Sequence, residues 1–391
     1  MIFVPPFAAQ RELLFISAFA RENPTEKERS VFMKKLLSIT ISALLCLSAA
    51  FAVACGKNED ADTGDGGKQD AEITGTVYAK YGESASDILP LMKTGKLHYA
   101  LLPEPAATKL NSLAPDTTFY RLDLQELYDA DTKAYPQAVM MIRSSLLNAY
   151  KDLAANIANS FADNVSWIKE NPADAVAAVN GKLEKGVTPS LAAGVITAEV
   201  VDNCKIFWQS AADAKDSVNK YLEDIIAIDA KASVKPQDDF FYNGTAEGDK
   251  TYDKITVYAP DGAPALAIAK FINDNYDLGT GLKVEYHVVS SGNIGPVLAG
   301  GKGDIVVMPV NAAAKLYLAN YAANSALGAE GNKYMMAGVV THGNLYIVSD
   351  QKISVEDLKD KTVGVIGMGL VPDLTFKAVL AKYGLELSVA D

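Results

Sequence analysis

Hydrophobic and polar positions along this chain switch repeatedly between two spacings. Short apolar runs rich in β-branched residues, such as "KITVYA", "KVEYHVV" and "DIVVMPV", are each followed by a stretch with apolar residues at helical spacing. Strands that alternate with helices predict parallel sheets covered by helices, which is the α/β class. Residues 144–233 differ, because helical spacing dominates there with an interruption at Pro172.

The chain is long enough for more than one hydrophobic core. It has 391 residues, of which 49% are hydrophobic and 21% charged. Single cores stop growing at roughly 250–300 residues, so two domains or one large two-lobed unit are expected.

An export signal is the clearest local feature. The segment 33–55, "MKKLLSITISALLCLSAAFAVAC", has two lysines, an apolar run and small residues before Cys55, the pattern of a secretory signal. The end "AVAC" followed by Gly56 resembles a bacterial lipobox, which makes Cys55 the expected lipidation site and new N-terminus. The alternative is an uncleaved membrane-spanning helix, since the apolar run nearly suffices for one.

The segments on either side of the signal lack core-forming patterns. Residues 1–32 precede a natural start at Met33 and remain an upstream segment of uncertain status. Residues 56–71 contain no aliphatic residue larger than alanine and no aromatic residue, so we expect a disordered tether. The folded body should then sit outside the cytoplasm, held to the membrane by its lipid.

Charge and cysteine content exclude several classes of protein. The net charge is −12 and no basic stripe occurs, which disfavours nucleic-acid binding. No C-x-x-C or Cys/His ligand spacing is present, so no structural metal site is expected. Cys204 lies in "VVDNCKIFW" and is expected to be a buried helical thiol.

Turns of small and polar residues follow several predicted strands. Ligands in open α/β sheets bind at the carboxyl ends of strands, where such turns lie. One of these turns, "GMGLVP", superficially matches the dinucleotide fingerprint, but Pro372 occupies its third glycine position. No nucleotide cofactor is therefore expected. The turns are "PEP" at 103–105, "PDG" at 260–262, "SSGN" at 290–293, "PVN" at 309–311 and "GMG" at 367–369.

Taken together, five segments resemble the solute-binding proteins of ABC importers, specifically the group that binds nitrate, sulfonates, taurine and thiamine pyrimidines. The segments are "LMKTGKLHYALLPEPAATKL", "WIKENPADAVAAV", "KITVYAPDGAPALAIAK", "VLAGGKGDIVVMPVNAAAKLY" and "GNLYIVSDQKISVEDLKDKTVGVIGMG". The resemblance implies a type 2 periplasmic-binding-protein fold, with a cleft between two α/β lobes. It also implies a monomer that delivers a small ligand to a membrane permease, without catalysis.

The order of these segments is not that of the family. Residues 72–242 resemble the family's second half and residues 253–391 its first half, so the resemblance implies a circular permutation or a misassembled reading of tandem genes. In this interpretation, "EITGTVYAKYG" is the strand to which the last helix returns, and 243–252 is a flexible linker at the joint. The implied second lobe is 72–142 with 346–391; the first is 143–242 with 253–345. The segments "QAVMMIRSS" and "NLYIVSD" would cross between them.

The resemblance places a candidate ligand site at the strand ends of both lobes. Serine hydroxyls at 290 and 291 could donate to an oxyanion, and His342 lies near a presumed hinge. Because Arg121 and Arg143 are the only arginines after the signal, a guanidinium clamp for sulfonate or phosphate is not evident. The expected contacts are Asp261, Gly262, Ser290, Ser291, Asn293, Asn311 and His342 from the first lobe, and Glu104 and Gly369 from the second.

Two other classes remain open at this point. One is an enzyme on the same fold, although no Ser/His/Asp or paired-carboxylate constellation stands out. The other is a surface lipoprotein that binds a protein partner instead of a small ligand. Turnover of a small molecule would indicate the enzyme, and ligand-independent partner binding would indicate the scaffold.

Overall fold

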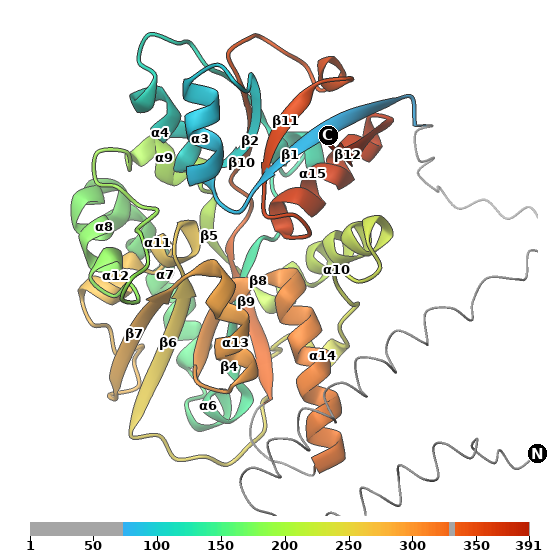
Figure 1. Ribbon diagram of the computed structural model, residues 1–391. Helices are drawn as coiled ribbons and strands as arrows, with labels where there is room; N and C mark the ends of the chain where they lie inside the picture. Colours follow the sequence, from blue (N-terminus) through green and yellow to red (C-terminus); the bar gives the residue numbers. More distant parts are fainter. Residues whose placement is uncertain (1–72, 328–332, 391) are drawn as a thin grey trace, which may run out of the picture. The chain divides into compact units, whose positions relative to one another are not determined.

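Two six-stranded sheets organise the part of the chain that the computed structural model describes, residues 73–327 and 333–390 (Figure 1). The predicted upstream segment (1–32), signal (33–55) and tether (56–71) lie outside these residues. The mixed α/β class and the two sheets flanked by helices are as the sequence predicts.

Sheet A corresponds to the predicted second lobe. Its strand order is β12-β1-β11-β2-β10-β3. The strands are β1 (Gly75–Gly82), β2 (Tyr99–Pro103), β3 (Tyr120–Asp123), β10 (Leu345–Ser349), β11 (Thr362–Ile366) and β12 (Leu385–Val389). Its helices are α3 (Ala85–Lys93), α4 (Ala106–Leu113), α5 (Leu124–Tyr128), η4 (Glu356–Leu358) and α15 (Val371–Lys382).

Sheet B corresponds to the predicted first lobe, with the order β5-β9-β4-β8-β6-β7. Its strands are β4 (Ala138–Arg143), β5 (Ile206–Ser210), β6 (Lys254–Pro260), β7 (Lys283–Val289), β8 (Ile305–Pro309) and β9 (Tyr334–Thr341). The accompanying helices are α6 (Ser144–Ala149), α7 (Leu153–Glu170), α8 (Pro172–Asn180), α9 (Ala198–Asn203), α10 (Ala211–Ile228), η2 (Asp238–Phe240), α11 (Ala263–Leu266), α12 (Ala269–Asn273), η3 (Ser291–Asn293), α13 (Ile294–Ala299) and α14 (Val310–Leu327).

Several strands are buried on both faces, which explains why they appear in the sequence as continuous hydrophobic runs and not as a strict alternation of apolar and polar residues. In β4, Val139 and Met141 join one hydrophobic cluster while Met140 and Ile142 join another. Successive side chains of a strand point to opposite faces, so both faces of sheet B are covered. The first cluster continues into sheet A through residues such as Leu101, and it therefore spans both lobes.

Two chain segments cross between the sheets. One leads from α5 to β4 through residues 129–137, and the other from β9 to β10 through 342–344. The sequence pattern predicts the first crossing later, at 137–145, with 138–142 in the second lobe. The structure corrects this boundary, because β4 pairs along its length with β8 and β9 of sheet B.

The strand registers bring corresponding edges of both sheets to these crossings. The first residue of β10, Leu345, lies opposite Pro103 at the end of β2. In sheet B, Ala138 at the start of β4 pairs with Pro309 at the end of β8. Because β1 and β11 run parallel with β2, and β6 and β7 with β8, their carboxyl ends share these edges. We call them the crossover edges of sheets A and B.

The strand that receives the last helix differs from the expectation. After α15 and Gly384 the chain forms β12, which returns to the sheet and pairs parallel with β1. The prediction that "EITGTVYAKYG" is itself the next strand after this helix is wrong, because "LELSV" takes that position first. The two strands are nevertheless neighbours in sheet A.

Residues 243–252 are held in place, contrary to the prediction of a flexible linker. The Ser144 hydroxyl donates to the Glu247 carbonyl (2.7 Å) and accepts from the Glu247 amide (2.8 Å). The Tyr252 hydroxyl lies 2.7 Å from that of Ser145, and the Tyr252 ring is buried. Polar composition alone indicated a loop, but its backbone groups find partners on α6.

Candidate functional site

Asp261 begins the polar surface at the crossover edge of sheet B. It follows β6, and its carboxylate accepts the backbone amides of Gly262 (2.9 Å) and Ser190 (2.7 Å). Gly262 has φ +104°, a left-handed conformation that favours glycine. The Ser190 contact ties the loop 181–197 to this edge.

The end of β7 extends this surface. Ser291 and Asn293 are exposed, and the Asn293 amide donates to Glu184 of the same loop (2.9 Å). Within residues 73–327 and 333–390, neither Ser290 nor Ser291 makes a side-chain hydrogen bond that would occupy its hydroxyl. Asp261, Gly262, Ser290, Ser291 and Asn293 therefore lie at the ends of adjacent strands, as predicted.

Asn311 does not belong to this surface. It lies at the start of α14 and is buried, and its side-chain amide donates to the Ala232 carbonyl (3.2 Å). The Asn311 carbonyl in turn accepts the Ser233 hydroxyl (3.4 Å). Asn311 thus anchors the segment after α10, which corrects its assignment as a ligand contact.

Glu104 is also committed to internal contacts. Its side chain is fully buried, accepting the Thr108 amide (3.0 Å) and hydroxyl (2.8 Å) and pairing with Arg121 (2.6 Å). Both carboxylate oxygens are used, so Glu104 holds the first turn of α4 in place of contacting a ligand. The sequence left this open, because Glu104 and Arg121 are separated by a helix and a loop.

His342 lies in the second crossing and is covered by an aromatic ring. The Phe207 ring stacks on it with centroids 3.5 Å apart and an interplanar angle of 6°. His342 is 3% exposed and its Nε2 lies 3.3 Å from the Gln209 amide oxygen. Burial lowers the pKa of His342 to about 3, so the ring is neutral at physiological pH. These contacts correct its assignment as a ligand contact.

Gly369 lies in an exposed loop at the crossover edge of sheet A. Its φ is +73°, and its amide donates to the buried carboxylate of Asp373 (2.8 Å). Asp373 also accepts the Tyr81 hydroxyl (2.7 Å) and pairs with Lys377. The flanking side chains of Met368 and Leu370 are 57% and 58% exposed, which places apolar groups beside the predicted contact.

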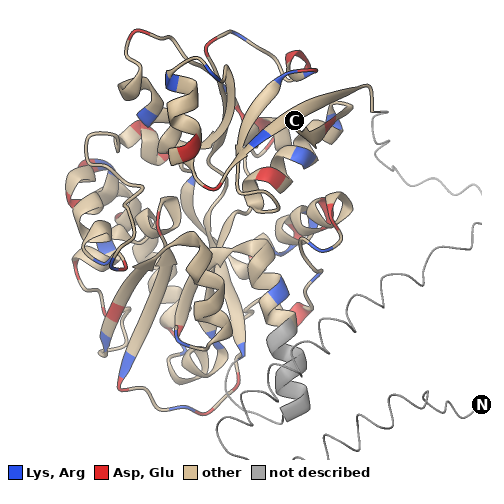
Figure 2. Cartoon of the chain, in the orientation of Figure 1, with Lys and Arg blue, Asp and Glu red and all other residues tan. Residues whose placement is uncertain are grey.

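Both arginines of the folded body are sequestered. Arg121 pairs with Glu104, and Arg143 pairs with Asp304 inside the sheet B lobe (3.1 Å). Elsewhere lysines and acidic residues are interspersed over both lobes (Figure 2). The predicted contacts at the crossover edge of sheet B are thus hydroxyls, an amide and a carboxylate, while the adjoining loop 181–197 also carries the exposed Lys182 and Lys185.

Other kinds of site find little support in the described part of the chain. It contains no group of three or more histidines, cysteines and acidic residues that could hold a metal, and no helix that could cross a membrane. Cys204 is buried at the end of α9, and burial raises its pKa, so the thiol stays protonated. A surface depression of about 400 Å³ lined by Tyr99 and Lys361 lies at the opposite edge of sheet A.

Sequence reasoning missed two parts of the candidate site. The loop 181–197 reaches the edge through Ser190 and Glu184, and its only sequence signal is the run "EKGVTPS". The apolar pair Met368 and Leu370 could have been noticed as large side chains between glycines.

Comparisons with known proteins give structural likeness only. No family model and no curated protein matches the chain, whereas 26 solved chains do. NikA from Brucella suis with Fe(III)-EDTA is 12% identical (TM-score 0.26) over 69% of this chain and 57% of its own. AppA, an oligopeptide-binding protein from Bacillus subtilis with a nonapeptide, is 8% identical (TM-score 0.28) over 69% of this chain and 55% of its own. The ABC transporter substrate-binding protein CtaP from Listeria monocytogenes is 9% identical (TM-score 0.30) over 74% of this chain and 57% of its own. The alignments thus span less than two thirds of each of these proteins.

Proposed function

We propose that this chain is the extracytoplasmic solute-binding component of an ABC importer. The observation that carries the proposal is that the carboxyl edges of two separate α/β sheets meet at two short crossings. Ligands of open α/β sheets bind at such edges, and two crossings allow the lobes to close by hinge motion. Closure around a small ligand would produce the form that a permease recognises.

The proposed ligand contacts are the predicted groups that lie exposed or half-buried at the crossover edges. Asp261, Ser290, Ser291 and Asn293 would bind polar atoms of the ligand, with Gly262 and Gly369 allowing close approach. A nitrate or sulfonate would need compensating positive charge, and both arginines are used elsewhere. Among the ligands of the resembling group, a neutral or cationic heterocycle such as a thiamine pyrimidine fits this surface best.

The remaining parts of the proposal follow from the sequence resemblance. Lipidation at Cys55 would anchor the protein to the membrane, and the permease would be its protein partner. We propose that it acts as a monomer without cofactor, metal or turnover, and without nucleic acid.

We also propose that the halves of the chain stand in permuted order relative to the resembling group. Both sheets are built from both halves, and β1 lies beside β12. A chain with residues 253–391 placed before 72–242 should then fold and bind the same ligand. Failure of the reordered chain to fold, while the natural order folds, would contradict the permutation without affecting the binding proposal.

Thermal melting with a ligand panel tests the binding function. The full chain carrying Cys55→Ser would be melted with pyrimidines, amines, sulfonates and nitrate, since a ligand selective for the folded state raises the melting temperature. Asp261→Ala and Ser291→Ala should each reduce the shift by weakening ligand binding at least tenfold. A matched control is Asp357→Ala, because Asp357 also accepts a local amide (2.8 Å) but precedes β11 at the opposite edge of sheet A.

The same experiment separates the alternatives. A shift given by pyrimidines but unaffected at Asp261 and Ser291 would overturn the site. A shift given only by sulfonates or nitrate would overturn the proposed ligand charge. Chemical conversion of the ligand, detected by mass spectrometry after incubation, would indicate that the protein is an enzyme and not a binding protein.

A further inference from the structure

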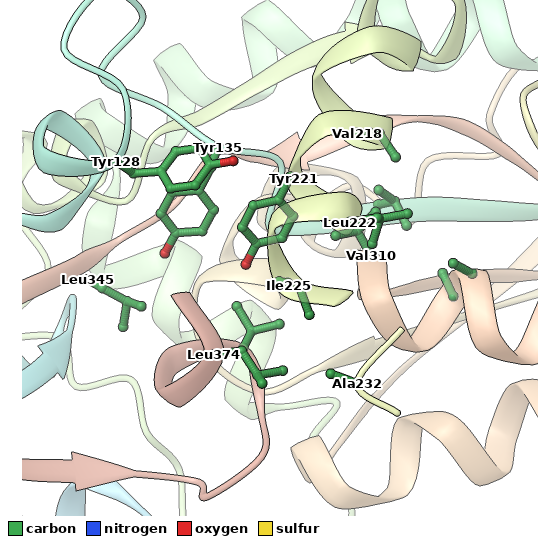
Figure 3. Close-up of a cluster of buried hydrophobic side chains, with 14 of the residues drawn as sticks. Tyr128, Tyr135, Val218, Tyr221, Leu222, Ile225, Ala232, Val310, Leu345 and Leu374 are labelled. Carbon is green, nitrogen blue, oxygen red and sulfur yellow. The ribbon is translucent and has the colours of Figure 1, made fainter. Parts of the chain in front are cut away.

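Helix α10 belongs by sequence to sheet B but packs on both lobes. It follows β5 and contacts β5, β9 and α14, while it also contacts α15 beside sheet A. Figure 3 shows Tyr221 and Ile225 of this helix close to Leu374 of α15. Any rotation of one lobe against the other must therefore change the contacts of α10.

Three tyrosines gather where α10 meets the first crossing. The ring of Tyr135 stacks on that of Tyr221, with centroids 5.1 Å apart and planes at 16°. Tyr128, at the end of α5, meets both rings edge-on at 5.5 and 5.7 Å. Tyr135 and Tyr221 are 1% and 0% exposed, so their hydroxyls have little access to water (Figure 3).

The hydroxyl of Thr375 on α15 links these rings to the sheet A lobe. It donates its proton to the Val371 carbonyl (2.8 Å), so it must accept the bond that joins it to the Tyr221 hydroxyl (2.7 Å). A hydroxyl oxygen has two acceptor lone pairs, but this one serves a single tyrosine. The buried hydroxyl of the stacked neighbour, Tyr135, lies near Thr375 without completing a hydrogen bond to it.

The second crossing has the same property. His342 Nδ1 is buried without a hydrogen-bond partner, and the His342 carbonyl accepts the Tyr135 amide (3.2 Å). Two of the five such side-chain atoms among the described residues thus lie on the two crossings, which are bonded to each other. Buried polar groups are normally paired, and an exception needs a physical explanation, one of which is a second arrangement that pairs the group.

We propose that Tyr135 and Tyr221 exchange the Thr375 hydroxyl between two positions of the lobes. In the arrangement described here, the Tyr221 hydroxyl donates to Thr375, and the Tyr135 ring is stacked on Tyr221 with its own hydroxyl unpaired. When α15 moves with sheet A relative to α10, Tyr135 on the crossing takes over the bond and Tyr221 releases it. The tyrosine pair then acts as a latch with two discrete positions, and each tyrosine stabilises one of them.

The test measures lobe positions without any ligand, so it is independent of the proposed function. Spin labels on Lys96→Cys and Asn273→Cys, one exposed residue in each lobe, report the distribution of distances between the lobes. The full chain would carry Cys46→Ser and Cys55→Ser, while the buried Cys204 stays. Tyr221→Phe, Tyr135→Phe and Thr375→Val are compared, each as a replacement that keeps the side-chain shape.

Opposite shifts are expected from the two tyrosines. Tyr221→Phe should move the population about fivefold to tenfold away from the described arrangement, and Tyr135→Phe should move it a similar factor toward it. In the Thr375→Val background neither replacement should have an effect. The matched control is Tyr286→Phe, which removes a buried hydroxyl bonded to Tyr276 inside the sheet B lobe and should leave the distribution unchanged.

Four results would overturn the latch. Shifts of both variants in the same direction, or a distribution that neither variant moves, would show that the hydroxyls are not exchanged. An effect of Tyr221→Phe with none from Tyr135→Phe would reduce Thr375 to a fixed contact of one state. Persistence of both effects in Thr375→Val would show that another group is the acceptor.

Discussion

Replacing His342 by glutamine should remove a measurable part of the acid sensitivity of this fold. The unfolded histidine has its ordinary pKa of 6.5, whereas burial under Phe207 lowers the folded pKa to about 3. The unfolded state therefore binds a proton between these values and the folded state does not. Stability from this group is fully present above pH 6.5 and is lost as pH falls toward 3.

The magnitude follows from the two pKa values. Between pH 7 and pH 5 the unfolded histidine becomes almost fully protonated while the folded one stays neutral, which costs about 2 kcal/mol of unfolding free energy. Since burial is the main cause of the shift, this cost should depend weakly on salt.

Urea unfolding of the wild type and His342→Gln at pH 7, 6 and 5 measures this difference. Glutamine does not titrate, so the wild type should lose about 2 kcal/mol more than the variant over this range. If the wild type and His342→Gln lost stability in parallel, the histidine would not be buried as described and the reasoning would fail.

Three further replacements test contacts that position the site. Arg121→Met should destabilise the protein by about 3 kcal/mol in urea unfolding, because it leaves the buried Glu104 without its counter-charge. An unchanged urea midpoint would mean that the pair is solvated. Asn164→Ala should lower the free energy of unfolding by about 2 kcal/mol in the same assay. Its buried amide donates to the Ala267 carbonyl (2.7 Å) and accepts the Lys270 amide (3.0 Å), between α11 and α12. A loss under about 0.5 kcal/mol, which is typical of surface changes, would refute this. Ser144→Ala should accelerate hydrogen exchange at the Glu247 amide about tenfold, which corresponds to a loss of roughly 1.4 kcal/mol of local protection. Equal exchange rates in the two proteins would support the prediction of a flexible linker.

Local pattern was sufficient to predict the α/β class and most elements. The buried run 254–260 became β6 and paired parallel with β7, and the interruption at Pro172 separates α7 from α8. The crossings were harder to place, because a fully buried strand such as β4 looks the same in either sheet. Only its pairing partners decide which lobe it joins, and these are remote in sequence.

The candidate site divides along the same line. Asp261, Ser291 and Asn293 could be predicted, since residues that follow parallel strands must share one edge. Asn311 and His342 could not be excluded, because the groups that occupy them, the Ala232 carbonyl and the Phe207 ring, lie 79 and 135 positions away. A polar residue after a strand is thus a candidate until its internal partners are known.

The two arginines show how ion pairs inside the lobes can limit the charge of the ligand that the surface would bind. A buried carboxylate requires a counter-charge, and Glu104 and Asp304 each obtain one from an arginine inside its own lobe. Recruiting Arg121 to an oxyanion would leave the buried Glu104 carboxylate without its counter-charge, at a cost of about 3–5 kcal/mol, whereas Asp304 also has Lys250 at 3.5 Å. Binding of a weakly basic, hydrated anion such as nitrate would have difficulty offsetting that cost. The charge preference of the proposed ligand would therefore depend on the cores of the lobes as well as on the surface that would touch it.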